Sequence, residues 1–486
     1  MSTSRRRFLS TSAAAGSSLW LVTALAAVQE SASTARQASG VKAGEITSRS
    51  AIIWTRLTQQ AERVDSPHSI EGQAKKEEAS LPAPVEQLAG ACPGAAGKIR
   101  VRYGTAEDLT HAVTTDWAAV EKSGDYAHPF QLNNLEPATT YFYAVETTDL
   151  AGVAKHGVRR GVFTTAPVAD VAAPVRLAFI NCQKFHTREQ PEGFEVYESI
   201  HKLKPSFVVF TGDNVYYDSD RPRAVTPDLA RYHWQRCYSL PRHVKLLSSV
   251  GTYWLKDDHD SHSDDAFPQR QKPIMGDFTF AEGLEIYRQQ VPIDQPYRTV
   301  RWGRDLQIWL MEGRDFRSAN SAADGQDKTI WGTEQKAWLK KTMLESTATW
   351  KLLLSPTPLV GPDRANKGDN HANVAFAHEG NELRQWFSQH IGNRFFWVNG
   401  DRHWQYHSVD PATGVNEFSV GAASDGNAGG TPGYDSKVHR FHLVQGGFLT
   451  IDVGDGEKPG TSRIRFELRN VFGKVAYTYS AEQPAL

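Results

Sequence analysis

The stretch YWLKDDHDSHSDD, Tyr253–Asp265, decides how the fold of this chain is interpreted. Its apolar start runs directly into two histidines and five aspartates that fall within nine residues. Like charges at this spacing repel one another, and a solvated loop normally dilutes them with Lys, Gly or Ser. The stretch therefore predicts that positive charge lies among these carboxylates.

The same arrangement recurs along the chain, where other apolar runs end in polar side chains. Continuous apolar segments, typical of buried strands, lead into Asn181-Cys182, Gly212-Asp213 and Gly400-Asp401. Segments with helical periodicity lie between several of these runs, at residues 194–203, 334–346 and 381–391. Strands that alternate with helices predict an α/β layered domain over residues 175–486, to which the alternating segments near the end add a hairpin or further strands.

The amino-terminal part has a different pattern. Short alternating segments separated by turn residues predict a small β-sandwich over residues 41–167. The phrase Leu135–Tyr143 resembles the strand-turn-strand phrase of fibronectin type III-like domains. The polar stretch near residues 59–97 lacks apolar periodicity, so it is predicted to be an insertion loop.

Residues 1–30 are predicted to be an export signal, because a basic run precedes a short apolar segment and small residues. Ser4–Leu9 resembles the twin-arginine signal, which predicts a periplasmic or secreted protein. A Sec signal or a retained anchor remains an alternative. No other apolar run is long enough to span a bilayer, so the mature chain is predicted to have no membrane span.

The amino-acid composition argues against binding to nucleic acid or to an anionic membrane through net charge. The chain has 486 residues, of which 40% are hydrophobic and 22% charged, as in soluble globular proteins with more than one core. Its 54 basic and 55 acidic residues nearly balance, so no global field would attract nucleic acid or an anionic membrane. The oligomeric state is open. No Gly-rich phosphate loop supports a nucleotide site.

The three cysteines, Cys92, Cys182 and Cys237, cannot all pair with one another. At least one is a free thiol, a ligand or an intermolecular partner. Cys92, in the insertion, and Cys237, in a predicted helix, are expected to be structural or incidental. Cys182 follows a predicted strand, and this position favours a ligand over an inert buried thiol.

The polar strand ends predict a metal centre. Ligand sites of α/β sheets lie at the carboxyl ends of strands, so residues at several such ends converge. Thiolate, phenolate, carboxylate and imidazole are all metal ligands. Because several carboxylates brought together need compensating cations, a site with two or more metal ions is expected.

Three motifs carry a resemblance. GD-xx-Y at Gly212–Tyr216, DDHD at Asp257–Asp260 and GDRH at Gly400–His403 resemble the metallophosphoesterase (calcineurin-like) superfamily, whose usual signature is GD-xx-D, then GNH with an acid, then GHxH. This chain has Tyr216 in place of Asp, Asp258 in place of Asn, and Asp401 in place of His. Together with Cys182 after the first strand, these three replacements give a motif pattern that resembles that of the alkaline phosphatase D (PhoD-like) family. The resemblance implies a four-layer metallophosphoesterase-type α/β sandwich preceded by a fibronectin III-like β-sandwich domain.

The resemblance also implies a ligand set. A ferric ion (Fe3+) would be held by Cys182, Asp213, Tyr216 and His403, with Asp213 bridging to a second cation. The second cation is calcium (Ca2+) in the family's characterised members, and its candidate ligands are Asp258, Asp264 and Asp401. A thiolate and a phenolate suit ferric iron, whereas hard carboxylates suit calcium. Other divalent metals remain alternatives.

The same resemblance implies an activity, the hydrolysis of small phosphate monoesters or diesters by attack of metal-activated water. His259 would stabilise the transition state or protonate the leaving oxygen, and Arg314 would hold a non-bridging phosphate oxygen. Two alternatives stay open: a hydrolase of another ester such as sulfate, and a non-catalytic secreted binding protein stabilised by calcium.

Several neighbouring residues have weaker assignments. Asp257 is expected to support a ligand, and His407 to pack or cap. His262, Asp264 and Asp265 either extend the site or belong to a solvated loop. Residues 369–371 are predicted to supply a further ligand or to shape the pocket, and the Gly-rich segment 421–430 to line the substrate cleft or form a surface turn.

Overall fold

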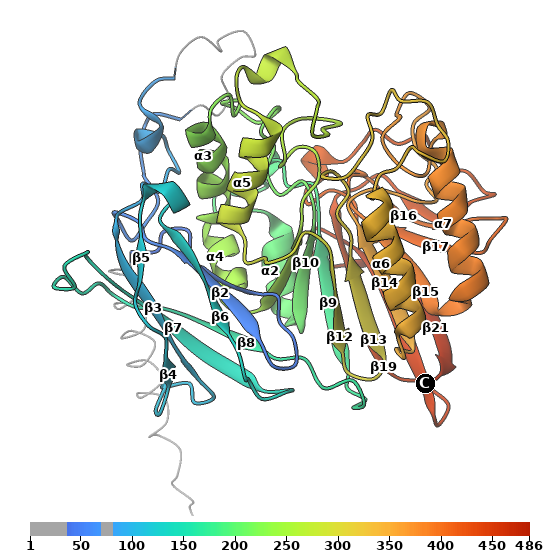
Figure 1. Ribbon diagram of the computed structural model, residues 1–486, viewed down its shortest axis with the longest axis horizontal. Coiled ribbons are helices and arrows are strands. Elements are labelled where there is room, and N and C mark those ends of the chain that lie inside the picture. Colours follow the sequence, from blue (N-terminus) through green and yellow to red (C-terminus); the bar gives the residue numbers. More distant parts are fainter. Residues whose placement is uncertain (1–35, 70–80) are drawn as a thin grey trace, which may run out of the picture.

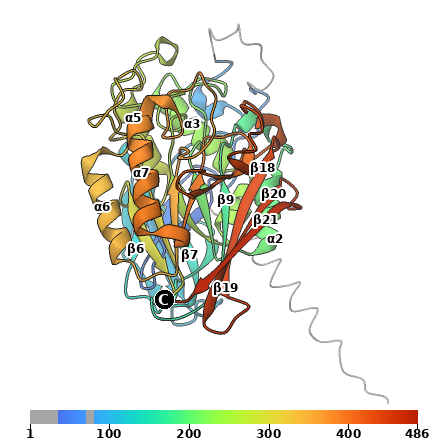
Figure 2. The ribbon, with the colours of Figure 1, turned by 90° about the vertical axis from the view of Figure 1, so that its right-hand side faces the viewer.

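The computed structural model describes residues 36–69 and 81–486, so the predicted signal at residues 1–30 and part of the predicted insertion lie outside the described residues. Two large sheets face each other, and helices cover their outer faces (Figure 1). Turned by 90°, the molecule shows α6 and α7 running side by side over one outer face (Figure 2). These layers confirm the predicted four-layer α/β sandwich.

The first sheet has nine strands in the order β21-β20-β19-β9-β10-β11-β1-β2-β6. β9, β10, β11 and β1 are parallel to their neighbours in that run, whereas β19 is antiparallel to β9. In that order, the bounds are Val475–Pro484, Thr461–Asn470, Gly447–Asp455, Val175–Ile180, Phe207–Thr211, Gly251–Leu255, Val41–Gly44, Ala51–Arg56 and Ala127–Leu132. The strands predicted near the end of the chain are thus β19, β20 and β21.

The second sheet has seven strands in the order β12-β13-β14-β15-β17-β16-β18. Its middle strands, β13, β14, β15 and β17, are parallel to one another. In sheet order, the bounds are Arg298–Trp302, Leu306–Leu310, Trp350–Ser355, Phe395–Asn399, Asn416–Ser419, Gln405–Val409 and His439–Leu443.

A smaller antiparallel sheet completes the amino-terminal β-sandwich, as predicted. Its strands are β4 (Val113–Thr114), β3 (Gly97–Gly104), β7 (Thr140–Thr148) and β8 (Arg159–Thr164), with β5 (Ala118–Val120) also paired to β3. The other sheet of this sandwich is made by β1, β2 and β6, and β1 pairs in parallel with β11. The sandwich therefore shares a continuous sheet with the α/β domain, a pairing across the predicted boundary that local sequence patterns cannot specify.

The helices have bounds of α2 Glu195–Leu203, α3 Pro227–Tyr238, α4 Pro241–Leu247, α5 Phe280–Gln290, α6 Gly332–Glu345 and α7 Ala377–His390. Capping residues in the sequence fix where several of these helices begin. Thr226 caps α3, where Pro227 takes the first helical position, and Thr279 and Glu282 form a capping box at α5. α2, α6 and α7 confirm the three helices predicted from periodicity.

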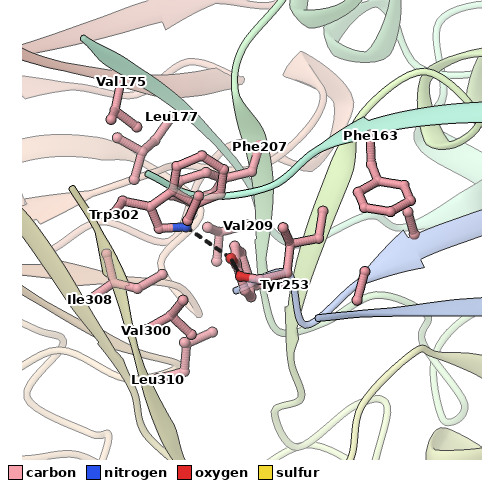
Figure 3. Close-up of a cluster of buried hydrophobic side chains, with 14 of the residues drawn as sticks. Phe163, Val175, Leu177, Phe207, Val209, Tyr253, Val300, Trp302, Ile308 and Leu310 are labelled. Carbon is pink, nitrogen blue, oxygen red and sulfur yellow. Dashed lines mark hydrogen bonds between the residues drawn. The ribbon is translucent and has the colours of Figure 1, made fainter. Parts of the chain in front are cut away.

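Alternate residues of each central strand face different layers. In β10, Phe207 and Val209 pack between the two sheets, whereas Val208 and Phe210 pack under α2–α5. Both faces are thus buried, which explains the continuous apolar runs. Figure 3 shows Phe207 and Val209 beside Trp302 of β12, whose indole donates to the Tyr253 hydroxyl at 2.9 Å. The strand ends are held on a rigid two-sided core.

The described parts of the predicted insertion dock on α3. Leu88 and Ala91 form a small apolar cluster with Tyr232, whose hydroxyl donates to the Ala89 carbonyl at 2.8 Å. Cys92 and Cys237 are buried free thiols, and Cys237 lies in α3 as predicted. Within the described ranges, none of the helices combines the length and apolar character that crossing a membrane requires.

Candidate metal centre

Four predicted strand ends meet at one edge of the two-sheet core. Cys182 follows β9, Asp213 follows β10, Asp257 and its neighbours follow β11, and Asp401 follows β15 of the second sheet. Because β9, β10 and β11 are adjacent and parallel, their carboxyl ends lie at the same edge. The centre therefore forms where the carboxyl ends of the two sheets meet.

The backbone turns sharply two residues after the end of three of these strands. Cys182, Asp213 and Asp401 all have left-handed backbone conformations, with φ of 50°, 51° and 61°. Non-glycine residues seldom adopt this region, and such outliers concentrate at functional sites. Gly400 permits the close approach of the two sheets, because a Cβ there would lie 2.7 Å from the Asn181 side-chain oxygen and closer still to the Thr211 carbonyl.

The first part of the centre, here called the cysteine half, comprises Cys182, Asp213, Tyr216 and His403. Cys182 Sγ lies 3.3 Å from Asp213 Oδ2, and the Tyr216 hydroxyl lies 3.1 Å from the same oxygen and 3.2 Å from His403 Nε2. One donor atom each from Cys182, Asp213 and His403 lie within 4.8 Å of one another. The structure thus brings together all four residues proposed from the resemblance for one ion.

When no metal ion is bound, burial controls the protonation of the donors in the cysteine half. It raises the pKa of the Cys182 thiol, the Tyr216 phenol and the Asp213 carboxyl well above their usual values, and neighbouring groups such as Asp213 add to the first two shifts. Burial also lowers the pKa of His403 to about 3. All four donors thus favour their neutral forms unless a cation lies among them.

These residues fit a metal ion. Asp213 Oδ1 is buried and has no hydrogen-bond partner among the described residues, an uncommon state for a native carboxylate oxygen. Sulfur, carboxylate and imidazole lie within this spacing, and the Tyr216 phenol oxygen is 3.1 Å from Asp213 Oδ2 and 3.2 Å from His403 Nε2, so the four form a mixed donor set that suits a transition-metal ion. Asp213 also belongs to two further candidate groups, one with Asp258 and His259 and one with Asp257 and Asp401.

The second part of the centre, here called the lysine half, comprises Asp258, Asp264, Asp265 and Lys367. The three carboxylates form a fourth candidate metal group, but the Lys367 ammonium lies 3.1 Å from Asp264 Oδ1 and 2.9 Å from Asp265 Oδ1. Asp401 is placed in a different group from Asp258 and Asp264, and the Arg402 guanidinium contacts it. The structure therefore does not bring the three residues proposed for the second cation into one candidate group.

Arginine, lysine and histidine side chains supply part of the positive charge that was expected among the carboxylates of Tyr253–Asp265. Burial opposes ionisation of Asp258, yet Arg314, His259 and Lys367 hold the pKa of its carboxyl well below the usual range. The Arg314 Nε donates to Asp257 Oδ1 at 2.5 Å, and its side chain is fully buried. Arg314 thus holds Asp257 from inside the protein, and it is not among the residues that line the cavity beside the centre.

His259 is oriented by a residue that the sequence did not single out. Its Nδ1 lies 2.7 Å from Asp218 Oδ1, and the other oxygen of Asp218 accepts from the Asp264 amide at 2.9 Å. Although burial disfavours the charged ring, Asp218 and Asp258 raise the pKa of His259 well above its usual value. With Nδ1 committed to Asp218, Nε2 is left as the atom that can transfer a proton.

A cavity of about 340 Å³ opens beside the centre. Its wall includes the predicted residues His259, Asp264, Asp401 and His403, together with the Gly-rich loop 426–430. Arg364, Lys367 and Trp404 also line it, and no local pattern distinguishes them in the sequence. Residues 369–371 lie behind this wall: Asp369 is 3.7 Å from Arg402, and His371 bonds Glu379 at 2.9 Å.

Two family models match the sequence. Residues 177–446, more than half of the chain, match the family described as PhoD-like phosphatase, and residues 23–167 match the PhoD-like phosphatase N-terminal domain. Alkaline phosphatase D of Bacillus subtilis (strain 168) is 22% identical over 353 residues, which are 65% of this chain. The match spans 54% of that relative, about half its length.

Solved structures share the fold. A structure of PhoD is similar with a TM-score of 0.68 at 17% identity, over 93% of this chain and 91% of the other. The purple acid phosphatase PPD1 from yellow lupin (Lupinus luteus) seeds is similar with a TM-score of 0.61 at 12% identity, over 90% of this chain and 73% of the other. At these identities, the likeness establishes the shared architecture of both parts of the molecule.

Proposed function

Since the chain belongs to the PhoD-like phosphatase family, we propose that it hydrolyses phosphate monoesters or diesters at this metal centre. The observation that carries the proposal is the meeting of Cys182, Asp213 and His403, with donor atoms within 4.8 Å of one another beside an open cavity. Four separate strand ends supply this centre, which a purely structural carboxylate cluster would not require.

The cysteine half is the proposed site of a ferric ion, because a thiolate and a phenolate stabilise Fe3+ better than they stabilise calcium. The second cation, proposed to be Ca2+, would take oxygen ligands from Asp213 and from Asp258 or Asp401, with Asp264 nearby. When bound, such ions supply Lewis acidity that activates water and neutralises charge on the phosphoryl oxygens. Asp213 is proposed to serve both ions, since it belongs to three of the candidate groups.

His259 is the proposed proton donor to the leaving oxygen. Asp218 holds its Nδ1 at 2.7 Å, so the proton on Nε2 is the one available at the cavity wall. Burial of Asp218, whose side chain is 6% exposed, keeps the ring in one orientation. The Gly-rich loop 426–430 closes one side of the cavity and would limit the entry of water.

Export by the twin-arginine pathway is proposed on sequence grounds alone. Ser4–Leu9 carries the paired arginines, and this pathway suits a protein that acquires its metals before export. Replacing Arg5 and Arg6 with Lys in the full chain should retain the protein in the cytoplasm, as measured by cell fractionation. Unchanged export would contradict this route.

The experiment that tests the function is metal analysis joined to hydrolysis assays. The mature protein would be purified without chelator, its metals measured, and p-nitrophenyl phosphate, bis-p-nitrophenyl phosphate and p-nitrophenyl sulfate assayed with Cys182→Ala and Asp213→Asn as comparison variants. Iron and calcium in the protein, with phosphate-ester turnover lost in both variants, are expected. Turnover that survives both substitutions would contradict this placement of the site, and turnover of the sulfate alone would contradict the substrate class.

A further inference from the structure

One part of the cavity wall carries hydrogen-bond donors that the proposed metal chemistry does not use. Arg364 lies in the connection after β14, and Trp404 directly follows His403. Both line the cavity of about 340 Å³ that also contains His259 and His403. Arg364 and Trp404 therefore share one cavity with two residues of the centre.

Of the described arginine and lysine side chains that line this cavity, Arg364 is the one with N–H groups that are free to bind a ligand. Its side chain is 33% exposed, and its one ion pair in the described structure is with Asp363, at 3.5 Å from Nε to Oδ1. Asp363 is already held by Arg402 at 2.5 Å, and Arg364 Nε has no hydrogen-bond partner among the described residues. Lys367 differs from Arg364, because its ammonium already forms ion pairs with Asp264 and Asp265.

Trp404 presents a second unused donor. Its side chain is almost completely buried, yet its indole Nε1 has no acceptor in the part of the chain that the structure describes. A buried N–H group without a partner is costly, so such groups usually have an acceptor in the working state. The Arg364 guanidinium carbon lies 6.0 Å from the centre of the Trp404 ring, within the range of a cation–π contact.

The Gly-rich loop is shaped to admit the Arg364 guanidinium. Gly430 has φ of +73°, and a Cβ at this position would lie 3.1 Å from Arg364 Nη1. A larger residue would therefore strain the backbone and press on the guanidinium at once. The glycine keeps the wall open at the place where Arg364 lies.

We propose that Arg364 and the Trp404 indole N–H form a subsite for phosphate oxygens of the phosphoryl group undergoing hydrolysis. This inference rests on the proposed function. A guanidinium offers a planar pair of donors that matches phosphate oxygens, and the indole N–H adds a third donor beside it. Arg314, to which the resemblance assigns a phosphate-binding role, donates its Nε to Asp257.

The test compares two substrates that share one scissile bond. Phenyl phosphate carries no anionic group other than its phosphoryl group, whereas 4-carboxyphenyl phosphate adds a carboxylate to the leaving group. Arg364→Ala is expected to lower kcat/KM for both substrates by roughly 10- to 100-fold, the usual effect of losing a charged hydrogen-bond partner. Arg364→Lys should recover only part of this loss, and Trp404→Phe should lower kcat/KM by about 3- to 10-fold.

Binding of inorganic phosphate to the metal-loaded protein, measured by calorimetry, gives a second readout. Arg364→Ala should weaken it by about tenfold or more. Arg463→Ala is the matched control, because Arg463 is a half-exposed arginine ion-paired with Glu457 and adjoins Val175, at the opposite end of β9 from the centre. It should leave both readouts unchanged.

Each outcome decides the proposal. An Arg364→Ala protein that behaves like Arg463→Ala in both readouts overturns the subsite. A loss confined to 4-carboxyphenyl phosphate, with phosphate binding unchanged, overturns the phosphoryl assignment in favour of an anion in the leaving group. If the wild-type protein binds phosphate through Arg364 but hydrolyses neither ester, Arg364 is a phosphate-binding residue and the proposed function fails, which also overturns the role of the subsite in hydrolysis.

Discussion

The two halves of the centre differ in what compensates the negative charge of their buried acidic groups. The cysteine half has no lysine or arginine bonded to its donors in the described structure, and burial raises the pKa of Cys182, Asp213 and Tyr216. In the lysine half, Lys367 bonds two carboxylates, and protein cations lower the pKa of Asp258. The cysteine half therefore depends on an added ion for its charged state, whereas Asp258 of the lysine half is kept ionised by protein cations.

An acidic cluster is therefore not in itself a metal site. Asp264 and Asp265 have the spacing of ligands, yet the ammonium of Lys367 already lies between them. Asp213, in contrast, has a buried oxygen without a partner among the described residues. Unsatisfied buried atoms point to a ligand more specifically than the number of carboxylates does.

The largest expected effect is on Asp213, which connects the two halves. Asp213→Asn keeps the shape of the side chain but removes a carboxylate from three candidate groups. Phosphoesterase kcat/KM should fall about 10³-fold or more, because a metal centre contributes several kcal/mol to transition-state stabilisation. Steady-state assays and metal analysis would measure this. Asp108→Asn, a change at a fully exposed carboxylate, is the control, and equal activity of the two variants would refute the role of Asp213.

A smaller loss is expected when His259 loses its partner. Asp218→Asn removes the carboxylate that holds His259 Nδ1 at 2.7 Å, so kcat should fall by roughly 10²-fold while metal content stays the same. Comparing kcat with KM for p-nitrophenyl phosphate measures the effect. A loss of bound metal with the same activity per metal would instead indicate that Asp218 supports the ligands.

Lys42 differs from Lys367, because its buried ammonium has no carboxylate partner among the described residues. Its Nζ donates to the Gln290 carbonyl at 2.6 Å and lies 4.0 Å from the centre of the Trp54 ring, and burial lowers its pKa to about 7. The unfolded chain, with a lysine pKa near 10.4, binds the proton more tightly, so the stability of the folded protein should rise between about pH 7 and pH 10.

Lys42→Met should remove this contribution, which is a few kcal/mol across that interval. Urea unfolding of both proteins at pH 7 and pH 9.5 provides the measurement. The wild-type protein should gain more stability on going to pH 9.5 than the variant does. An equal gain in both proteins would mean that Lys42 keeps its proton in the fold.

The smallest effect is expected from changing Lys367 itself. Burial opposes its charge, but Asp369 and Asp265 raise the pKa of its ammonium above the usual value. Lys367→Met should therefore destabilise the metal-free protein and tighten calcium binding by about tenfold, because Asp264 and Asp265 lose their internal cation. Thermal unfolding with and without calcium tests this. A variant whose calcium-induced shift equals that of the wild-type protein would show that the lysine half does not take calcium.

Much of the fold was predictable because its determinants are local. Apolar runs identified β9, β10, β11 and β15, and helical periodicity identified α2, α6 and α7. Pairings between distant segments were not predictable: β1 joins β11 across 207 residues, from Gly44 to Gly251 at the closest strand ends. Such a pairing depends on the backbone of the folded sheet, which carries no sequence motif.

The candidate residues of the centre could be identified from local sequence, since Cys182, Asp213, Tyr216 and His403 each follow a buried strand within a recognisable motif. The partners of the charged residues around the centre depend on the folded chain: Arg314 is bound to Asp257, Lys367 to Asp264, and Asp218 to His259. The reason is physical. A strand end is specified by neighbours along the chain, whereas the charge that compensates a buried carboxylate comes from whichever loop the fold brings within about 4 Å.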